Sequence, residues 1–346
     1  MTQVEIPIQN IYYLLSYAWN KLEESNVVPV KDIDCRSAVD LFAKVLSNGM
    51  RYIMRRGLDR GYIPHEEQTS RLRGQVDFSA TLKTTFFRDP SLFCEYDEFS
   101  YDVLHNQIVR TTIARLIQIA DMDKAVREEL RLIEQRLRQV SLIPLAKKHF
   151  SLVQLHGNNY FYDFLLKVCE LVYDNLMVSE EDGSSKFRDF LRDDDAMGRL
   201  FEGFVRNFFR REQSEFEVGC EIINWQAKLL GDTPAGLLPT MKTDVSLTSP
   251  KRKIIIDTKY YAQALQVHYQ KESIHSGNLY QLHAYLTNIS SDEGEQSKCE
   301  GILLYPTVEK ELDLRYEIKG HKVSIRTINL NQDWKDIHQS LLKMGA

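Results

Sequence analysis

Apolar residues recur every three or four positions through much of the chain, which is the pattern of amphipathic helices. The first such stretch runs from Ile11 to Leu22, and Asn10 before it is expected to be its N-cap. A second stretch runs from Ser37 to Arg56 and is expected to stop at Gly57. Further helices are predicted over Leu104–Leu116, Val126–Val140, Tyr162–Val178, Leu200–Phe208, Asn278–Leu286 and Trp334–Leu341.

Short apolar segments between turn residues predict strands in two parts of the chain. Residues 60–100 are rich in glycine, proline and short apolar pieces, which is typical of short strands and loops. Three consecutive isoleucines, Ile254 to Ile256, predict a buried strand, and the turn sequence Thr248–Lys251 before it predicts a hairpin. Two more strands are predicted over Gly301–Tyr305 and Val323–Ile328.

The chain has 346 residues, which favours two domains. The break at Asp121–Asp123 predicts an antiparallel pair of helices on either side of it, ended by Pro144, and we place the boundary between residues 155 and 156. Residues 1–155 are expected to form an α+β domain of helices, short strands and the helix pair. Residues 156–346 are expected to form an α/β domain with a central mixed sheet. The polar run 179–185 predicts a flexible loop.

Composition narrows the class of protein. Hydrophobic residues make up 43% and charged residues 27%, as in a soluble globular protein, and no apolar run approaches the ~18 residues of a membrane helix. The five scattered cysteines form no C-x-x-C pair, and the N-terminal segment lacks a signal-peptide pattern, so a cytoplasmic protein with reduced thiols is expected. Neither a G-x-x-x-x-G-K-[ST] phosphate loop nor a G-x-S-x-G motif is present.

The residues with the clearest chemical meaning are Asp244, Asp257 and Lys259. Side chains alternate along a strand, so Asp257 and Lys259 are expected on one face, roughly 6.6 Å apart along the chain. The predicted hairpin brings Asp244 next to them. Two carboxylates suffice to hold Mg2+, and a lysine beside them can assist the attacking water and the phosphate. The pattern therefore favours metal-dependent phosphodiester cleavage over an ordinary surface salt bridge, although a bare D-x-K match is common by chance.

Two further oxygen ligands are candidates for the same metal. The carbonyl of Thr258 lies between the two active side chains. Glu202 lies beside the apolar face of the Leu200–Phe208 helix and could reach the sheet as a ligand. The alternative for Glu202 is an i,i+4 ion pair with Arg206, and the sequence leaves both open.

Gln281 and Tyr285 are candidates for supporting roles, because they lie four residues apart on one helix face after the site strands. They could contact the DNA backbone or orient Lys259, or they could simply fill a helix–sheet junction. Basic residues gather in both halves of the chain and could bind phosphate, although a charge run is usually a solvated face. These are Arg206, Arg210 and Arg211 in one half, and Arg51, Arg55, Arg56, Arg60, Arg71 and Arg73 in the other. The net charge of −5 gives no overall attraction to a polyanion, so such patches would be needed.

The arrangement of Asp244, Asp257 and Lys259 resembles the PD-(D/E)xK nuclease superfamily, with Thr243 where that motif often has proline. Longer segments resemble the McrC family, the nuclease subunit of the McrBC modification-dependent restriction system. They are IPIQNIYYLLSYAW, RLRGQVDFSATL, TDVSLTSPKRKIIIDTKYY, NLYQLHAYL and GILLYPTV.

This resemblance implies partners and activities that the spacing of residues does not. McrC-like subunits work with McrB, a hexameric AAA+ GTPase that reads methylated cytosine, and they bind that motor through their N-terminal half, insert into its pore and stimulate GTP hydrolysis. Residues 1–155 would then bind the partner, and GTP would be used by the partner and not by this chain. Cleavage of double-stranded DNA by the complex would need Mg2+.

The expected function is therefore that of a Mg2+-dependent endonuclease subunit of a GTP-dependent, 5-methylcytosine-directed restriction complex. Two alternatives remain: a non-catalytic activator of the motor, and a stand-alone DNA repair nuclease.

Overall fold

The computed structural model describes residues 6–23, 37–85, 91–178, 185–187, 191, 193–228, 230, 236–260, 265–268, 271–289, 299–307 and 311–345. The chain divides into two compact units, one formed by Asn26–Arg188 and the other by Met1–Ser25 together with Asp189–Ala346. Among the helices that the structure describes, none combines the length and the apolar character needed to cross a bilayer.

The Asn26–Arg188 unit is built on packed helices. Its helices are α3 (Ala38–Arg56), α5 (Leu104–Ile117), α6 (Lys124–Arg136), α7 (Lys147–Leu152) and α8 (Phe161–Asn175), with a 3-10 turn at Gly157–Asn159 and a small hairpin of β4 (Leu176–Val178) and β5 (Ser185–Phe187). As predicted, α3 ends at Gly57, whose φ of 101° suits glycine. The Ser37 hydroxyl caps the N-terminus of α3 by accepting a hydrogen bond from the amide of Asp40. The predicted helix pair is present as α5 and α6, which pack against each other.

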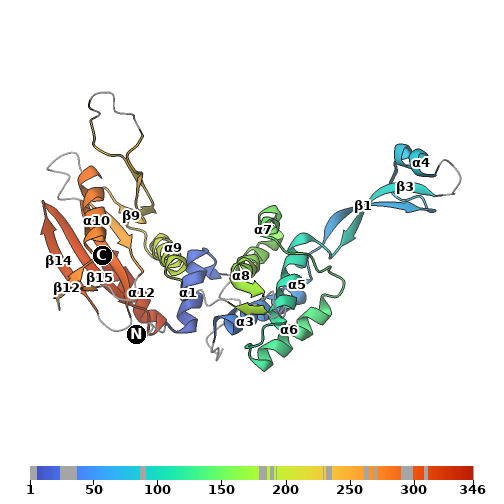
Figure 1. Cartoon of the computed structure of the whole chain (residues 1–346), viewed down its shortest axis with the longest axis horizontal. Coiled ribbons are helices and arrows are strands. Elements are labelled where there is room, and N and C mark those ends of the chain that lie inside the picture. The colour runs from blue at the N-terminus through green and yellow to red at the C-terminus, as the bar shows by residue number, and fades with distance from the viewer. Residues whose placement is uncertain are drawn as a thin grey trace. The chain divides into compact units, whose positions relative to one another are not determined.

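A long antiparallel ribbon belongs to the same unit. Strands β1 (Gly61–Thr69) and β3 (Leu92–Ser100) pair along their full length, and β2 (Gln75–Val76) adds to β3. Figure 1 shows the ribbon extending away from the helices, with α4 (Phe78–Thr85) at its far end. Strands were expected over residues 60–100, but the ribbon is longer than the predicted short strands and α4 was not predicted.

The second unit contains a six-stranded mixed sheet, which confirms the predicted mixed sheet. Its order is β14–β15–β13–β10–β9–β6. The pairs β10–β13 and β13–β15 are parallel, and the other three pairs are antiparallel. The bounds are β6 (Glu217–Gly219), β9 (Val245–Thr248), β10 (Lys253–Thr258), β13 (Cys299–Thr307), β14 (Asp313–Ile318) and β15 (His321–Asn329). Two smaller hairpins are formed by β7 (Ile222–Ile223) with β8 (Met241–Lys242) and by β11 (Leu265–His268) with β12 (Lys271–Ile274).

Helices cover both faces of this sheet. Leu282, Tyr285 and Leu286 of α10 (Ser276–Ile289) form a buried cluster with strand residues that include Ile255 and Leu303. Helices α9 (Asp194–Glu212) and α12 (Trp334–Gly345) also contact strands of this sheet and contact each other, and α1 (Ile8–Ala18) packs on α9. The fully buried Ile254, Ile255 and Ile256 confirm the predicted core strand, since both of its faces are covered.

The structure divides the chain differently from the predicted boundary at 155/156. The N-terminal helix α1 joins the unit that holds the sheet, because the Tyr17 ring packs against Phe204 and Phe208 of α9 and Asn207 donates hydrogen bonds to the carbonyls of Tyr17 and Ala18. Helix α8 stays with α3 and α5. Periodicity shows that a helix has an apolar face, but it does not show which helix that face covers.

Two local predictions also need correction. Asn10 does not cap α1, which begins after Pro7; instead its side chain donates to the carbonyls of Leu330 and Gln332, at 2.8 and 2.9 Å. The helix predicted to reach Val178 ends at Asn175, and the chain continues as β4. Of the predicted 179–185 loop, residues 179–184 lie outside the described part of the chain, and residue 185 belongs to β5.

Candidate active site

The predicted hairpin brings the three principal candidates to one end of the β9–β10 pair. The last paired residues are Val245 and Ile256, so Asp244 comes just before β9 and Asp257 comes just after this last pair, still within β10. Lys259 comes just after β10, where its amide donates to the carbonyl of Leu304 and extends the contact with β13. Ile255 belongs to the cluster under α10, and period two places Asp257 on that same face.

Asp257 is a fully buried carboxylate with one cationic neighbour. Its Oδ2 lies 2.9 Å from Nζ of Lys259, which confirms that both side chains lie on one side of the strand. Apart from this ion pair, no hydrogen-bond donor in the described part of the chain reaches either carboxylate oxygen. Burial raises the pKa of Asp257 to about 7; Lys259 opposes this, and the charges of Asp244 and Glu202 add to it.

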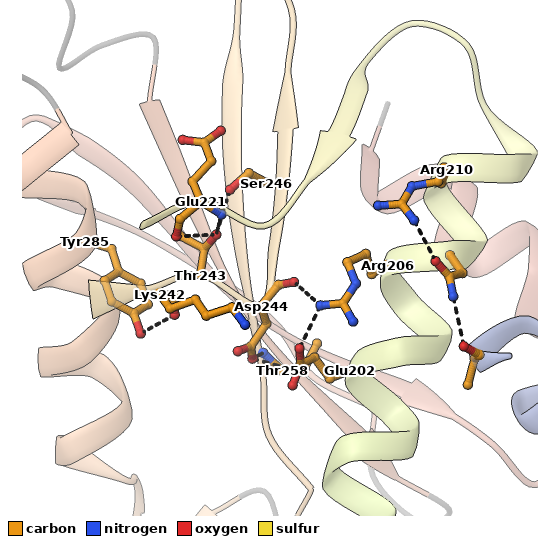
Figure 2. A network of polar contacts seen from close by, with 12 residues as sticks. Glu202, Arg206, Arg210, Glu221, Lys242, Thr243, Asp244, Ser246, Thr258 and Tyr285 are labelled. Atoms are coloured by element: carbon orange, nitrogen blue, oxygen red, sulfur yellow. Dashed lines mark hydrogen bonds and ion pairs between the residues drawn. The ribbon is translucent and has the colours of Figure 1, made fainter. Parts of the chain in front are cut away.

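Asp244 is held by the residue that follows Asp257 in the chain. Oδ2 of Asp244 accepts hydrogen bonds from the amide of Thr258 at 2.7 Å and from its hydroxyl at 2.9 Å. Figure 2 shows Asp244 close to Thr258, with Arg206 and Glu202 of α9 beside them. These contacts use the amide and hydroxyl of Thr258, so the suggested metal contact of its carbonyl remains a prediction.

Glu202 and Arg206 form the ion pair that the sequence left open. Nη1 of Arg206 lies 2.7 Å from Oε1 of Glu202 and also donates to the backbone carbonyl of Asp244 at 3.3 Å (Figure 2). Glu202 is nevertheless close enough to Asp257 to raise its pKa. The helix therefore brings Glu202 to the site, where its carboxylate is paired with Arg206.

Tyr285 and Gln281 support the segment that leads to Asp244. The amide of Gln281 donates to the hydroxyl of Tyr285 at 2.6 Å, and that hydroxyl donates to the carbonyl of Lys242 at 2.9 Å. The ring of Tyr285 is buried, which raises the pKa of its hydroxyl; Gln281 opposes this rise and the charges of Asp257 and Asp244 add to it. Both residues thus lie at the site, and their position favours a supporting role for the Lys242–Asp244 segment.

The oxygen atoms gathered here fit a hard divalent cation. Asp244 and Asp257 are adjacent carboxylates, and the oxygens of Asp257 are buried with few protein partners, which is costly unless a cation compensates. Within the residues described, no group of three or more histidine, cysteine or acidic side chains is arranged to hold a metal. The candidate set is therefore two carboxylates, which is enough for a cation that keeps several waters.

A family model described as "McrBC 5-methylcytosine restriction system component" matches residues 9–306. The chain belongs to this family. A relative from Escherichia coli (strain K12), "Type IV methyl-directed restriction enzyme EcoKMcrBC", is 32% identical over 342 residues, which cover 99% of this chain and 98% of that protein. These matches confirm the McrC-family resemblance seen in the sequence.

A solved structure supports the fold of this McrBC family member. It is a half-complex of Thermococcus gammatolerans McrB AAA+ hexamers with bound McrC, and it matches with a TM-score of 0.58 over 98% of this chain and 76% of that chain. The two sequences are 17% identical, so this likeness concerns the fold alone. The span matched by the McrBC family includes all the candidate site residues, from Glu202 to Tyr285.

Sequence reasoning missed a second group of contacts before Asp244. The hydroxyl of Thr243 accepts from the amide of Glu221 at 2.8 Å and lies 2.9 Å from the hydroxyl of Ser246, and the amide of Thr243 donates to the carbonyl of Glu221 (Figure 2). The sequence singles out Thr243 only as the position where the superfamily motif often has proline. No local pattern predicts this contact, because Glu221 and Thr243 are joined by a long connection.

The predicted phosphate-binding edge on α9 consists of arginines that already have protein partners. Arg210 donates to the side chain of Asn207, and Arg211 pairs with Glu23 and Glu212. Their contact with phosphate remains a prediction.

Proposed function

We propose that this McrBC family member is the Mg2+-dependent DNA endonuclease subunit of a GTP-dependent, 5-methylcytosine-directed restriction complex. The observation that carries the proposal is the ion pair between the buried Asp257 and Lys259, with Asp244 beside it across the β9–β10 hairpin. A mixed sheet covered by helices, with acids and a lysine at the end of a core hairpin, also supports a PD-(D/E)xK restriction-endonuclease-like domain.

The site residues would have different roles in phosphodiester hydrolysis. Asp244 and Asp257 would hold Mg2+, which supplies Lewis acidity to the scissile phosphate and to the attacking water. The side chain of Lys259 is 17% exposed, and we assign to its ammonium group, which faces Asp257, a hydrogen bond to the attacking water or to a phosphate oxygen. The Lys242–Asp244 segment is fixed by Tyr285, which limits the movement of Asp244.

The proposed partner is a McrB-like AAA+ GTPase hexamer. The E. coli relative is named for a McrBC enzyme, and the T. gammatolerans assembly contains McrB hexamers with bound McrC. This sequence has no phosphate loop of its own, which agrees with GTP being used by the partner. We assign binding and stimulation of the GTPase to the N-terminal part of the chain, and the ribbon-bearing Asn26–Arg188 unit is a separate body suited to that role.

The test is cleavage of plasmid DNA that carries 5-methylcytosine by this chain mixed with its McrB-like partner. The proposal expects cleavage that needs Mg2+, GTP, the partner and the methyl groups together. Stimulated GTP hydrolysis without any cleavage would favour the non-catalytic activator. Cleavage of unmodified DNA without partner or GTP would favour a stand-alone nuclease. Either outcome would contradict the proposed function.

A further inference from the structure

We propose that Thr258 is a positioning residue that orients the Asp244 carboxylate for the metal. This inference rests on the proposed nuclease function. It concerns the side chain of Thr258 and not its carbonyl, the candidate metal ligand; that side chain neither holds the metal nor touches the substrate in the proposed mechanism.

The first argument comes from the way the β9–β10 ladder ends. Successive amides along a strand point to opposite neighbours, and the Lys259 amide donates to Leu304 of β13. The Thr258 amide therefore points toward β9. The ladder on that side stops at Ile256 and Val245, so no backbone carbonyl of the described residues pairs with this amide there. Oδ2 of Asp244 accepts the hydrogen bond instead, at 2.7 Å.

The second argument is that the hydroxyl of Thr258 meets the same oxygen. Oγ1 donates to Oδ2 of Asp244 at 2.9 Å, and Thr258 is buried, with 8% of its surface exposed. Two donors from one residue fix the carboxylate both in place and in rotation. Because both donors meet Oδ2, we assign Oδ1 of Asp244 to the cation.

A separate contact holds the backbone of Asp244. Arg206 donates to its carbonyl from α9, and Glu202 in turn pairs with Arg206. With its backbone held, Asp244 can still rotate its carboxylate, and the hydrogen bonds from Thr258 restrict that rotation. Loss of the hydroxyl should weaken metal binding, because it removes one of the two donors that orient the carboxylate. The fold should be affected less, because the amide of Thr258 still holds Asp244.

The test compares Thr258→Val, which removes the hydroxyl at nearly constant shape, with Thr258→Ser, which keeps it. Thr327→Val is the matched control: Thr327 is equally buried, lies in the same sheet, and its hydroxyl accepts from the amide of Leu312. Calorimetric titration with Mg2+, and with Ca2+ as a probe of the same carboxylates, measures binding without DNA. Single-turnover cleavage over a range of Mg2+ concentrations gives the half-saturating metal concentration and the rate at saturation.

We expect Thr258→Val to weaken metal binding and raise the half-saturating Mg2+ concentration by about tenfold, the usual effect of removing a residue that orients a metal ligand. Cleavage at saturating Mg2+ should recover most of the original rate. Thr258→Ser and Thr327→Val should bind metal like the unsubstituted protein. Unchanged binding in Thr258→Val, or equal losses in Thr258→Val and Thr258→Ser, would overturn the inference while leaving the nuclease function intact. Absence of metal binding and cleavage in the unsubstituted protein would contradict the proposed function itself.

Discussion

The ammonium group of Lys259 lies 2.9 Å from the carboxylate of Asp257, a side chain with no exposed surface. Burying a carboxylate is costly, and here the compensation is one lysine that is itself partly exposed. Burial keeps the pKa of Asp257 at about 7. A buried carboxylate of this kind lowers the stability of the folded state, and such groups are typical of functional sites.

The first prediction concerns stability and pH in metal-free protein. The pKa of Asp257 is about 7 in the folded state, above the 3.8 of an ordinary aspartate, so the folded state binds the proton more tightly. Stability from this group is present at low pH and is lost as the pH rises through 7. Between pH 6 and pH 8 the loss should be about 1.4 kcal/mol. Asp257→Asn has no such titration.

Urea denaturation in EDTA measures this difference. The free energy of unfolding of the unsubstituted protein, minus that of Asp257→Asn, should fall between pH 6 and pH 8. Equal pH dependence in the two proteins would show that Asp257 does not titrate in this range. Asp313→Asn, at an exposed surface aspartate of the same sheet, is the control.

The second prediction concerns Glu202. Its carboxylate is paired with Arg206, so Glu202→Gln should leave metal affinity nearly unchanged, within about fivefold, as expected for a partly exposed ion pair. Asp244→Asn should lose most of the affinity. Calorimetric titration with Mg2+ checks both. A loss in Glu202→Gln as large as that in Asp244→Asn would make Glu202 a metal ligand.

The third prediction concerns the hydroxyl of Tyr285. Its removal in Tyr285→Phe leaves the carbonyl of Lys242 without that donor and should cost about 1 kcal/mol of stability. Tyr280→Phe, at an exposed position of the same helix, should have little effect. Urea denaturation of both variants is the measurement, and equal stability of the two would show that the Tyr285–Lys242 hydrogen bond contributes nothing.

The fourth prediction follows from the position of α1. Deletion of residues 1–23 should expose Phe204 and Phe208 of α9 and speed amide hydrogen exchange there, because Tyr17 packs on both rings. Exchange in α3 should stay as it is, since α3 belongs to the other unit. Faster exchange in α3 with no change in α9 would restore the predicted division at residue 155.

The sequence was sufficient for the features that depend on short-range pattern. Three isoleucines followed by Asp257 and Lys259 predicted a core strand with both side chains on one face, and the turn before it predicted the hairpin. The end of α3 at Gly57 follows from the same local chemistry.

What the sequence could not show depends on contacts between distant segments. The hydrogen bonds from Thr258 to Asp244 require the ladder to stop at one particular pair, and the Arg206 contact requires α9 to pack at one position along the sheet. The placement of α1 on α9 likewise depends on which apolar face meets which. Periodicity gives each element a face but leaves its neighbour undetermined.

The most direct test of the central claim is Asp257→Ala in the complete complex with the McrB-like partner, with DNA cleavage and GTP hydrolysis measured in the same reaction. We predict that cleavage of methylated plasmid falls to background while stimulation of GTP hydrolysis is retained, because Asp257 is proposed to bind the metal and has no proposed role in stimulating the partner's GTPase. Asp313→Ala should cleave normally. Cleavage by Asp257→Ala at the rate of the unsubstituted protein would contradict the assignment of this site.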